Sequence, residues 1–233
     1  MIAYQNVHIF FGTEQDNINK NTYPLNGQQS FTSIADRLMV DNLYYVNQVH
    51  STKGVIVDKN TKQNALTSVD ADFLITDNIC TALAVFTADC TPVMLYDPVV
   101  SVIAAVHAGW KGLAADVIQH ALFALQKNYD VQLNNIQAFI GPSAKSCCYE
   151  IQNNVYDIFK NMERVEICSF VSQKEGKFFL DLPACAKQQL IVGGISLGNI
   201  NRQFAGCTIC NKKYCSYRRE QNSLRNVNVI VMR

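Results

Sequence analysis

The chain has 233 residues, of which 48% are hydrophobic and 17% are charged, so it is long and apolar enough to bury a large core. Its formal net charge of +1 at pH 7 supplies neither a basic field for nucleic acid nor a polybasic segment for an anionic membrane. The start lacks the pattern of a secretory signal, and no apolar run approaches the ~18 residues of a membrane span. We therefore expect a cytoplasmic protein that binds neither nucleic acid nor a membrane.

Apolar periodicity and turn-forming residues divide the chain into helices and strands. In chain order, they predict a helix at 31–39, strands at 43–49, 54–57, 73–76, 82–87, 93–96 and 102–106, helices at 113–127, 153–162 and 183–191, and a strand at 228–232. No internal repeat or low-complexity linker interrupts this order. The pattern predicts a single α/β domain over residues 1–233, with a mixed α+β sheet and helices packed outside it.

Three residues that bind soft or borderline metals follow predicted strands. His50 and His107 are two of only four histidines, and Cys90 ends a third strand, which Pro92 is expected to limit. Imidazole and thiolate suit zinc or copper, and three protein ligands with a vacant fourth position are typical of catalytic zinc. The spacing matches no short metal motif. A purely structural alternative is therefore open, in which the three side chains pack separately and bind no metal.

A glycine-containing turn follows His107. Gly109 and Gly112 allow backbone N–H groups to approach a ligand closely, and Lys111 adds a positive charge at the start of the next helix. This combination suits phosphate. An equally good explanation of the two glycines is that they only allow a tight turn and bind no anion.

Near the end of the chain, cysteines and arginines are concentrated. Cys207, Cys210 and Cys215 suggest a zinc knuckle, but no fourth cysteine or histidine follows at suitable spacing, so we do not favour it. We expect most of the nine cysteines to be reduced thiols. Arg218 and Arg219 suit bidentate binding of a phosphate or carboxylate, or pairing with Glu220 and other surface acids.

Taken together, these segments resemble the YfiH-like family, also labelled laccase-domain or polyphenol-oxidase-like proteins and assigned as purine nucleoside phosphorylases. The resemblance extends from about residue 48 to the end of the chain. Its motifs are Gln48-Val-His50, Asp70-Ala-Asp-Phe-Leu-Ile-Thr76, Thr87-Ala-Asp-Cys90-Thr-Pro-Val, His107-Ala-Gly-Trp-Lys-Gly112, Ile140-Gly-Pro142, Cys148-Tyr-Glu150, Asp181-Leu182, Cys207-Thr and Ser216-Tyr-Arg-Arg219.

The resemblance implies a single α/β domain whose fold is similar to that of certain cysteine-hydrolase-like domains. It implies that His50, Cys90 and His107 bind a catalytic Zn²⁺, with copper as the alternative metal. The implied partners are a purine nucleoside and phosphate, because the family's activities are phosphorolysis of adenosine, inosine, guanosine and methylthioadenosine, and deamination of adenosine. The oligomeric state is not indicated.

Two features bear on the mechanism expected from this resemblance. Deamination needs a carboxylate that moves protons without binding the metal, and Asp89 and Glu150 are the nearest candidates. For Asp89 we favour a different role, which is to cap a turn or to orient a histidine. The family's N-terminal Thr-Arg-x-Gly-Gly signature is reduced here to Phe10-Phe-Gly-Thr13-Glu, which places an N-terminal contact to substrate in question.

Three other functions stay open. The first is a cysteine-hydrolase-like amidase, in which Cys90 would be the nucleophile and His107 the base. Editing of peptidoglycan precursors would be a suitable role for it. Copper oxidase chemistry fits poorly, because four histidines cannot supply several copper centres. In a non-enzymatic binding module, a fourth protein ligand would close the metal site.

Overall fold

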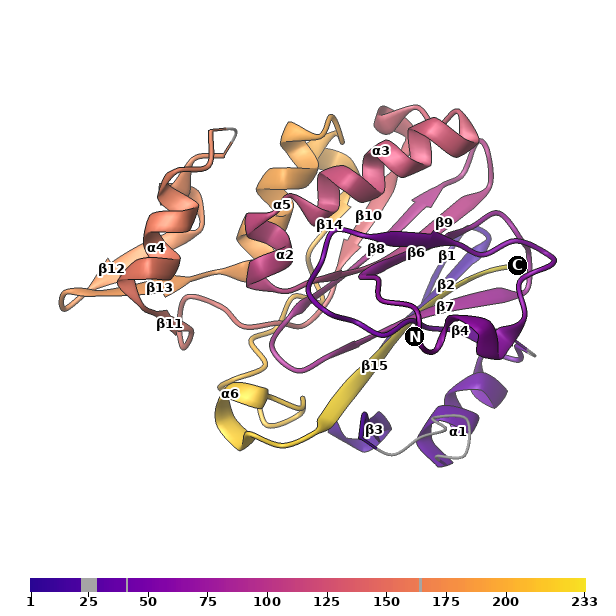
Figure 1. Cartoon of the computed structure of the whole chain (residues 1–233), viewed down its shortest axis with the longest axis horizontal. Helices are drawn as coiled ribbons and strands as arrows, with labels where there is room; N and C mark the ends of the chain where they lie inside the picture. Colours follow the sequence, from indigo (N-terminus) through magenta and orange to yellow (C-terminus); the bar gives the residue numbers. More distant parts are fainter. Residues whose placement is uncertain (22–28, 41, 164) are drawn as a thin grey trace.

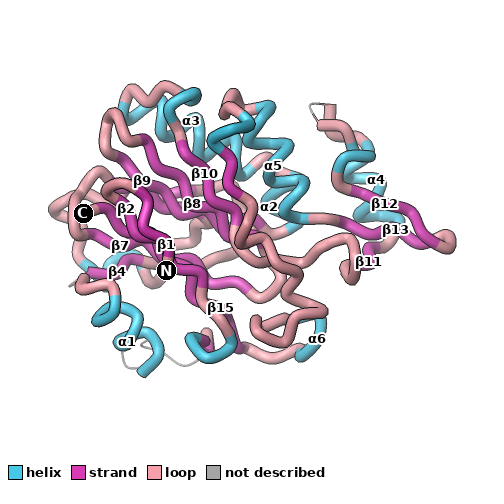
Figure 2. Tube along the Cα trace, turned by 180° about the vertical axis from the view of Figure 1, so that it is seen from behind, coloured by secondary structure: helices cyan, strands magenta, loops and turns pink. Residues whose placement is uncertain are grey.

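The computed structural model describes residues 1–21, 29–40, 42–163 and 165–233. Two six-stranded sheets pack face to face, and helices cover their outer faces (Figures 1 and 2). Side chains from both sheets, including Leu83, Met94 and Ile103, form the core between them. This arrangement confirms the predicted α/β fold class.

The first sheet joins the two ends of the chain. Its strands lie in the order β1 (Ile2–Tyr4), β2 (Val7–Phe11), β15 (Leu224–Met232), β7 (Thr81–Thr87) and β4 (Asn42–Tyr44), and β3 (Asn17–Asn19) also pairs with β15. β15 runs antiparallel to both β2 and β7. Strands from both ends of the chain therefore share one sheet.

The second sheet carries the candidate site at one edge. Its order is β14 (Ile200–Asn201), β10 (Gln137–Ile140), β8 (Thr91–Asp97), β9 (Val102–Ala108), β6 (Phe73–Thr76) and β5 (Gly54–Ile56). Every residue of β8 and β9 is buried, because helices cover one face and the first sheet covers the other. Such two-sided burial explains their nearly continuous apolar sequences.

Helices form the outer layers. α1 (Gln29–Arg37) packs on the first sheet, whereas α2 (Trp110–Ala114), α3 (Val117–Tyr129) and α5 (Leu182–Val192) cover the second. α4 (Asn153–Lys160) accompanies a small sheet of β11 (Glu150–Ile151), β13 (Lys177–Leu180) and β12 (Val171–Lys174), which extends to one side in Figure 1. α6 (Tyr217–Glu220) precedes β15, and short 3-10 turns lie at Glu14–Asp16, Gln63–Leu66, Leu133–Asn135, Ile167–Ser169 and Leu197–Asn199.

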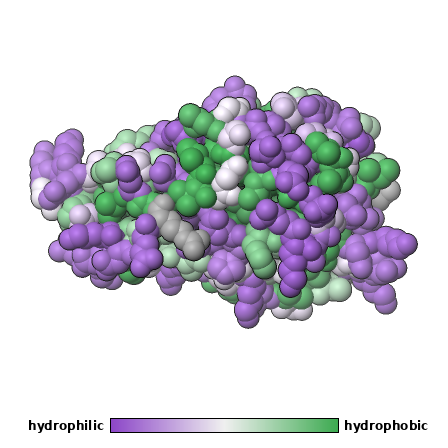
Figure 3. Space-filling model, turned by 90° about the horizontal axis from the view of Figure 1, so that it is seen from above, coloured by the Kyte–Doolittle hydropathy of each residue, from purple (hydrophilic) through white to green (hydrophobic). Residues whose placement is uncertain are grey.

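The surface above the second sheet is mixed in polarity. Figure 3 shows hydrophobic residues among hydrophilic ones on this side, and exposed apolar side chains include Phe123 of α3 and Val192 of α5. Across the described ranges, no helix combines the length and apolar character needed to cross a membrane.

Several element boundaries differ from those predicted. The expected helix at 113–127 is two helices, because the chain turns at Asp116, whose φ of 61° is left-handed. The expected strand at 43–49 ends at Tyr44. Pro92 does not limit a strand: it is the second residue of β8, near the strand start, where its missing N–H is tolerated. Cys90 lies in the turn between β7 and β8.

Candidate active site

The register of the second sheet brings the three candidate ligands together. In the antiparallel β8–β9 pair, Pro92 lies opposite His107, so Cys90, just before β8, reaches the end of β9. His50 arrives from the loop that follows β4. Its Nε2 lies 3.6 Å from the Cys90 sulfur, and the possible ligand atoms of His50, Cys90 and His107 all lie within 4.8 Å of one another. The three side chains therefore form one cluster.

Asp72, just before β6, orients this cluster. Its fully buried carboxylate accepts a hydrogen bond from His107 Nδ1 at 2.8 Å and another from the backbone N–H of His50 at 2.9 Å. It also accepts the backbone N–H and, at 2.8 Å, the hydroxyl of Ser51. A carboxylate can only accept, so Nδ1 of His107 carries hydrogen, and Nε2 is the ring nitrogen left for Cys90 or a metal ion.

The cluster favours a cysteine thiolate. Loss of water raises the pKa of the Cys90 thiol, but the charge and hydrogen bonds of His107 and His50 lower it overall, to about 6. Loss of water lowers the pKa of His107, whereas the Cys90 charge and the Asp72 hydrogen bond raise it to about 9. A thiolate is the form of cysteine that binds metals and attacks electrophiles.

Gly109 makes the close packing of the cluster possible. A Cβ atom at this position would lie 2.6 Å from Cδ2 of His50 and 2.9 Å from the Cys90 sulfur. Any side chain here would therefore displace a ligand. Gly112 is buried within α2, where a Cβ atom would meet Val117 at 3.3 Å, and it does not line the pocket.

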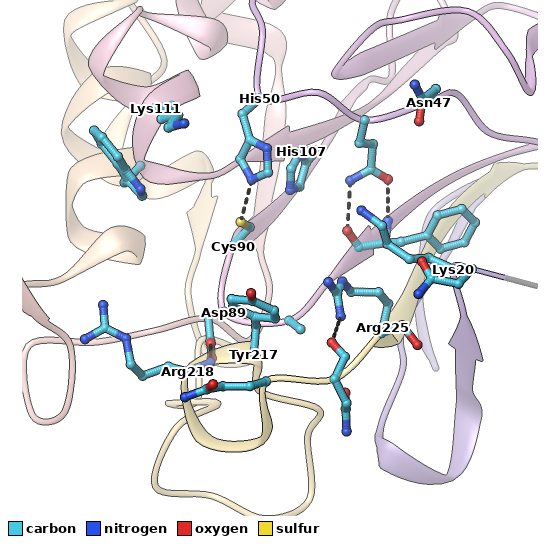
Figure 4. Close-up of a pocket in the computed structure, with 18 of the residues that line it drawn as sticks. Lys20, Asn47, His50, Asp89, Cys90, His107, Lys111, Tyr217, Arg218 and Arg225 are labelled. Carbon is cyan, nitrogen blue, oxygen red and sulfur yellow. Dashed lines mark hydrogen bonds between the residues drawn. The ribbon is translucent and has the colours of Figure 1, made fainter.

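The cluster lies in a cavity of about 890 Å³, a size typical of small-molecule sites. Figure 4 shows the cluster in the middle of this cavity, with the cationic residues Lys20, Lys111, Arg218 and Arg225 around it. Several cations around one cavity favour an anionic ligand. Sequence reasoning had selected Lys111 and Arg218, but it missed Lys20 and Arg225, which belong to none of the motifs.

The two neighbouring arginines have different surroundings. Arg218 lines the pocket, where its guanidinium lies 4.8 Å from the centre of the Tyr149 ring and donates to the Glu150 carbonyl at 3.0 Å. Arg219 instead donates to the carbonyl oxygens of Thr208, Ile209 and Tyr214 and pairs with the Glu220 carboxylate. Arg219 therefore holds the C-terminal loop, whereas Arg218 is available to a ligand.

The candidate proton-transfer carboxylates are already engaged. One Asp89 oxygen accepts the Thr208 hydroxyl at 2.7 Å, and the other accepts the backbone N–H of Arg218 at 2.7 Å. Glu150 pairs with Lys177 at 3.0 Å and does not line the pocket. Asp89 thus binds the first turn of α6, and Asp72 is the carboxylate that orients a histidine.

The donor set fits a metal ion. Two imidazoles and a thiolate-prone cysteine converge from three segments, and a buried carboxylate fixes the ring of one imidazole. Such carboxylate–histidine pairs commonly support metal ligands. The cavity beside the cluster leaves room for a substrate or water in a fourth position, as catalytic sites require.

We predict that Asp72→Asn weakens metal binding by about 10- to 100-fold, the usual cost of losing a partner that orients a ligand. The asparagine amide has one acceptor oxygen where Asp72 has two, so it cannot accept all the hydrogen bonds that Asp72 receives. Its NH₂ group would instead face other donors. Competition with a coloured chelator measures the affinity. Asp70→Asn is the matched control, because Asp70 is an exposed carboxylate bonded to Asn47. Equal affinity of Asp72→Asn and the wild type would contradict this role.

Comparison with known proteins identifies the family of this chain. Residues 14–233 match the family model described as multi-copper polyphenol oxidoreductase laccase. A Clostridium acetobutylicum protein named purine nucleoside phosphorylase is 33% identical over 220 residues, covering 92% of this chain and 87% of its own. A protein named adenosine deaminase, from an unknown prokaryotic organism, is 28% identical over 172 residues, covering 69% of this chain and 63% of its own.

The solved structures show the same fold. The crystal structure of the hypothetical protein YfiH from Bacillus licheniformis matches with a TM-score of 0.85 and 29% identity, covering 97% of this chain and 93% of that one. These matches confirm the resemblance seen in the motifs. The chain therefore belongs to the family described as multi-copper polyphenol oxidoreductase laccase, which includes the YfiH-like proteins.

Proposed function

We propose that this protein is a zinc-dependent purine nucleoside phosphorylase. Its substrates would be adenosine, inosine, guanosine or methylthioadenosine together with phosphate, and its products a free base and a sugar 1-phosphate. The observation that carries this proposal is a His-Cys-His cluster inside a cavity surrounded by cations. The relative named purine nucleoside phosphorylase supports it. A cytoplasmic location is part of the proposal, since none of the nine cysteines, all of them among the described residues, forms a disulfide.

Phosphorolysis defines what the pocket has to do. A phosphate oxygen forms a bond to C1′ of the ribose while the bond from C1′ to N9 of the purine breaks. The bonding electron pair stays with the purine, which takes up one proton. The pocket must hold phosphate against C1′ and stabilise the negative charge on the departing base.

Residues of the pocket suit these two tasks. Lys111 and Arg218 provide cationic donors for phosphate, and the Arg218 side chain lies against Tyr149. Trp110 and Tyr217 line the same cavity, and their rings are candidate stacking partners for a purine. One pocket thus contains cationic donors for phosphate and aromatic rings for the base.

A metal ion held by His50, Cys90 and His107 would supply Lewis-acid stabilisation of negative charge in the pocket. Zinc suits two imidazoles and one thiolate with an open position, and copper is the alternative metal. The four histidines of the chain are too few for several copper centres. The chain's own residues therefore favour a single metal and no oxidase chemistry at this site.

Adenosine deamination is a second candidate, favoured by the relative named adenosine deaminase. That reaction needs a free carboxylate to move protons. Among the described residues that line the cavity, Asp89 has the only carboxylate, and its two oxygens accept hydrogen bonds from Thr208 and Arg218. The site therefore favours phosphorolysis as the main reaction.

A cysteine-hydrolase-like amidase is the remaining enzymatic alternative. The thiolate-prone Cys90 beside two histidines resembles a nucleophile with its base. This mechanism needs no metal and forms a covalent adduct on the Cys90 sulfur. The cations around the cavity argue for an anionic substrate instead.

We predict that the zinc-loaded protein releases free base from adenosine or inosine only when phosphate is present. Loss of a residue that only orients a metal ligand usually costs ~10- to 100-fold. Cys90→Ala removes a ligand itself, so we expect a larger fall in kcat/KM. Liquid chromatography separates the products. Cys80→Ala is the control, because Cys80 is exposed and lies outside the His50, Cys90 and His107 cluster. Inosine formed from adenosine would indicate deamination. Full activity without metal would instead support the hydrolase and contradict the proposal.

We also predict that Lys111→Ala and Arg218→Gln raise KM for phosphate by about 10-fold each, because each removes one charge-assisted contact. The backbone N–H of Arg218 that binds Asp89 survives the substitution. KM for the nucleoside should change much less. Lys127→Ala, an exposed lysine in the last turn of α3, is the control. Unchanged phosphate KM in both variants would place the phosphate elsewhere.

A further inference from the structure

Four cysteines gather outside the candidate active site. Cys147 and Cys148 precede β11, and Cys207 and Cys210 lie in the loop before α6. Their four sulfur atoms all lie within 4.8 Å of one another. The sequence suggested Cys215 as a partner of the last two, but Cys215 is buried apart from this group, with its backbone N–H bonded to Asn226. Cys147 and Cys148 instead complete a set of four.

The spacing of the sulfurs suits a single tetrahedral ion. Four thiolates bound to zinc at ~2.3 Å lie about 3.8 Å apart along the edges of the tetrahedron. The Cys147 and Cys210 sulfurs lie 3.9 Å apart. An iron–sulfur cluster places its own iron and sulfide atoms between the cysteines and needs a wider arrangement. A disulfide would bring one pair to about 2.05 Å and leave the other two sulfurs unexplained.

The backbone holds the two halves of this cluster in place. Ser143 and Cys207 form a parallel bridge, in which the Ser143 N–H donates to Gly206 and the Thr208 N–H donates to Ser143. The segments carrying the two cysteine pairs are thus aligned by contacts that involve no sulfur. The cluster does not depend on a metal to bring its parts together.

The Cys207 sulfur has the surroundings of a metal-bound thiolate. The backbone N–H groups of Cys210, Lys145 and Ile209 donate hydrogen bonds to this sulfur. Ligands in metal sites are commonly supported by such donors. Two of the three donors belong to the short loop that also carries Cys210, so the loop folds around the sulfur.

We propose that Cys147, Cys148, Cys207 and Cys210 form a second metal site, which binds one Zn²⁺ through four thiolates. Four protein ligands leave no open position, so the site is structural. Each cysteine that enters as a thiol releases its proton to solvent when its bond to zinc forms.

The second site is connected to the active-site turn. Thr208, next to Cys207, donates its hydroxyl to Asp89 at 2.7 Å, and Asp89 directly precedes Cys90. Arg219 binds the carbonyl oxygens of Thr208 and Ile209 at 2.8 and 2.9 Å. An ion at the cysteine cluster would therefore stabilise the loop that holds the turn before Cys90.

Elemental analysis of the full chain, purified without chelator, tests this proposal. We expect about two zinc ions per wild-type chain, and about one in Cys90→Ala and in the double variant Cys147→Ser with Cys210→Ser. Cys80→Ser is the control and should keep two, because Cys80 belongs to neither cluster. Equal zinc in the wild type and the double variant would overturn the proposal. Since no activity is measured, the result is independent of the proposed function.

A cobalt spectrum decides the question even where the double variant does not fold. Cys90→Ala loaded with Co²⁺ should show the intense sulfur-to-cobalt charge-transfer bands and the visible bands of a tetrahedral four-thiolate site. A spectrum without these bands would overturn the proposal. So would peptide mapping that finds Cys147 and Cys210 joined as a disulfide in the purified protein.

Discussion

The buried Asp72 carboxylate accepts hydrogen bonds from the His107 ring and from the backbone of His50 and Ser51. Burying a carboxylate is costly unless several donors compensate it. The loop that carries His50 must therefore wrap around Asp72, and His50 takes a left-handed φ of 62° in doing so. One interaction thus fixes two of the three candidate ligands and selects the tautomer of one.

The remaining parts of the site depend on the register of the second sheet. β8 begins where β9 ends, so Cys90 and His107 meet at one edge, and the lack of a side chain at Gly109 allows His50 to close the cluster. The C-terminal loop then adds Arg218 through the Asp89 cap. Anionic chemistry at this edge follows from the cations that these separate segments bring together.

Much of this fold was readable from local sequence. The strands at 73–76 and 102–106 are predictable because each is an apolar run between turn residues. These runs are apolar because both faces of the second sheet are buried. The break at Asp116 was not predicted, because the apolar spacing continues through it. There the Gln189 side chain of α5 binds the Leu113 carbonyl and the Asp116 side chain, a tertiary contact that no local pattern shows.

The candidate site was likewise predictable only in part from the sequence. His50, Cys90 and His107 were selected by residue type and by resemblance to a family, whereas their spacing alone matched no motif. The role of Asp72 was missed, although its motif had been noted, because a carboxylate near a strand gives no sign of which histidine it faces. The cysteine cluster was incomplete in sequence for a similar reason: its two pairs lie about 60 residues apart, and tertiary contacts such as the Ser143–Cys207 bridge bring them together.

In the proposed reaction, this site transfers a sugar from a purine to phosphate. Phosphorus NMR of the zinc-loaded protein with inosine and phosphate follows that transfer. We expect a new sugar 1-phosphate signal that grows in step with free hypoxanthine. Free hypoxanthine with no phosphate ester, or unchanged inosine and phosphate, would contradict it.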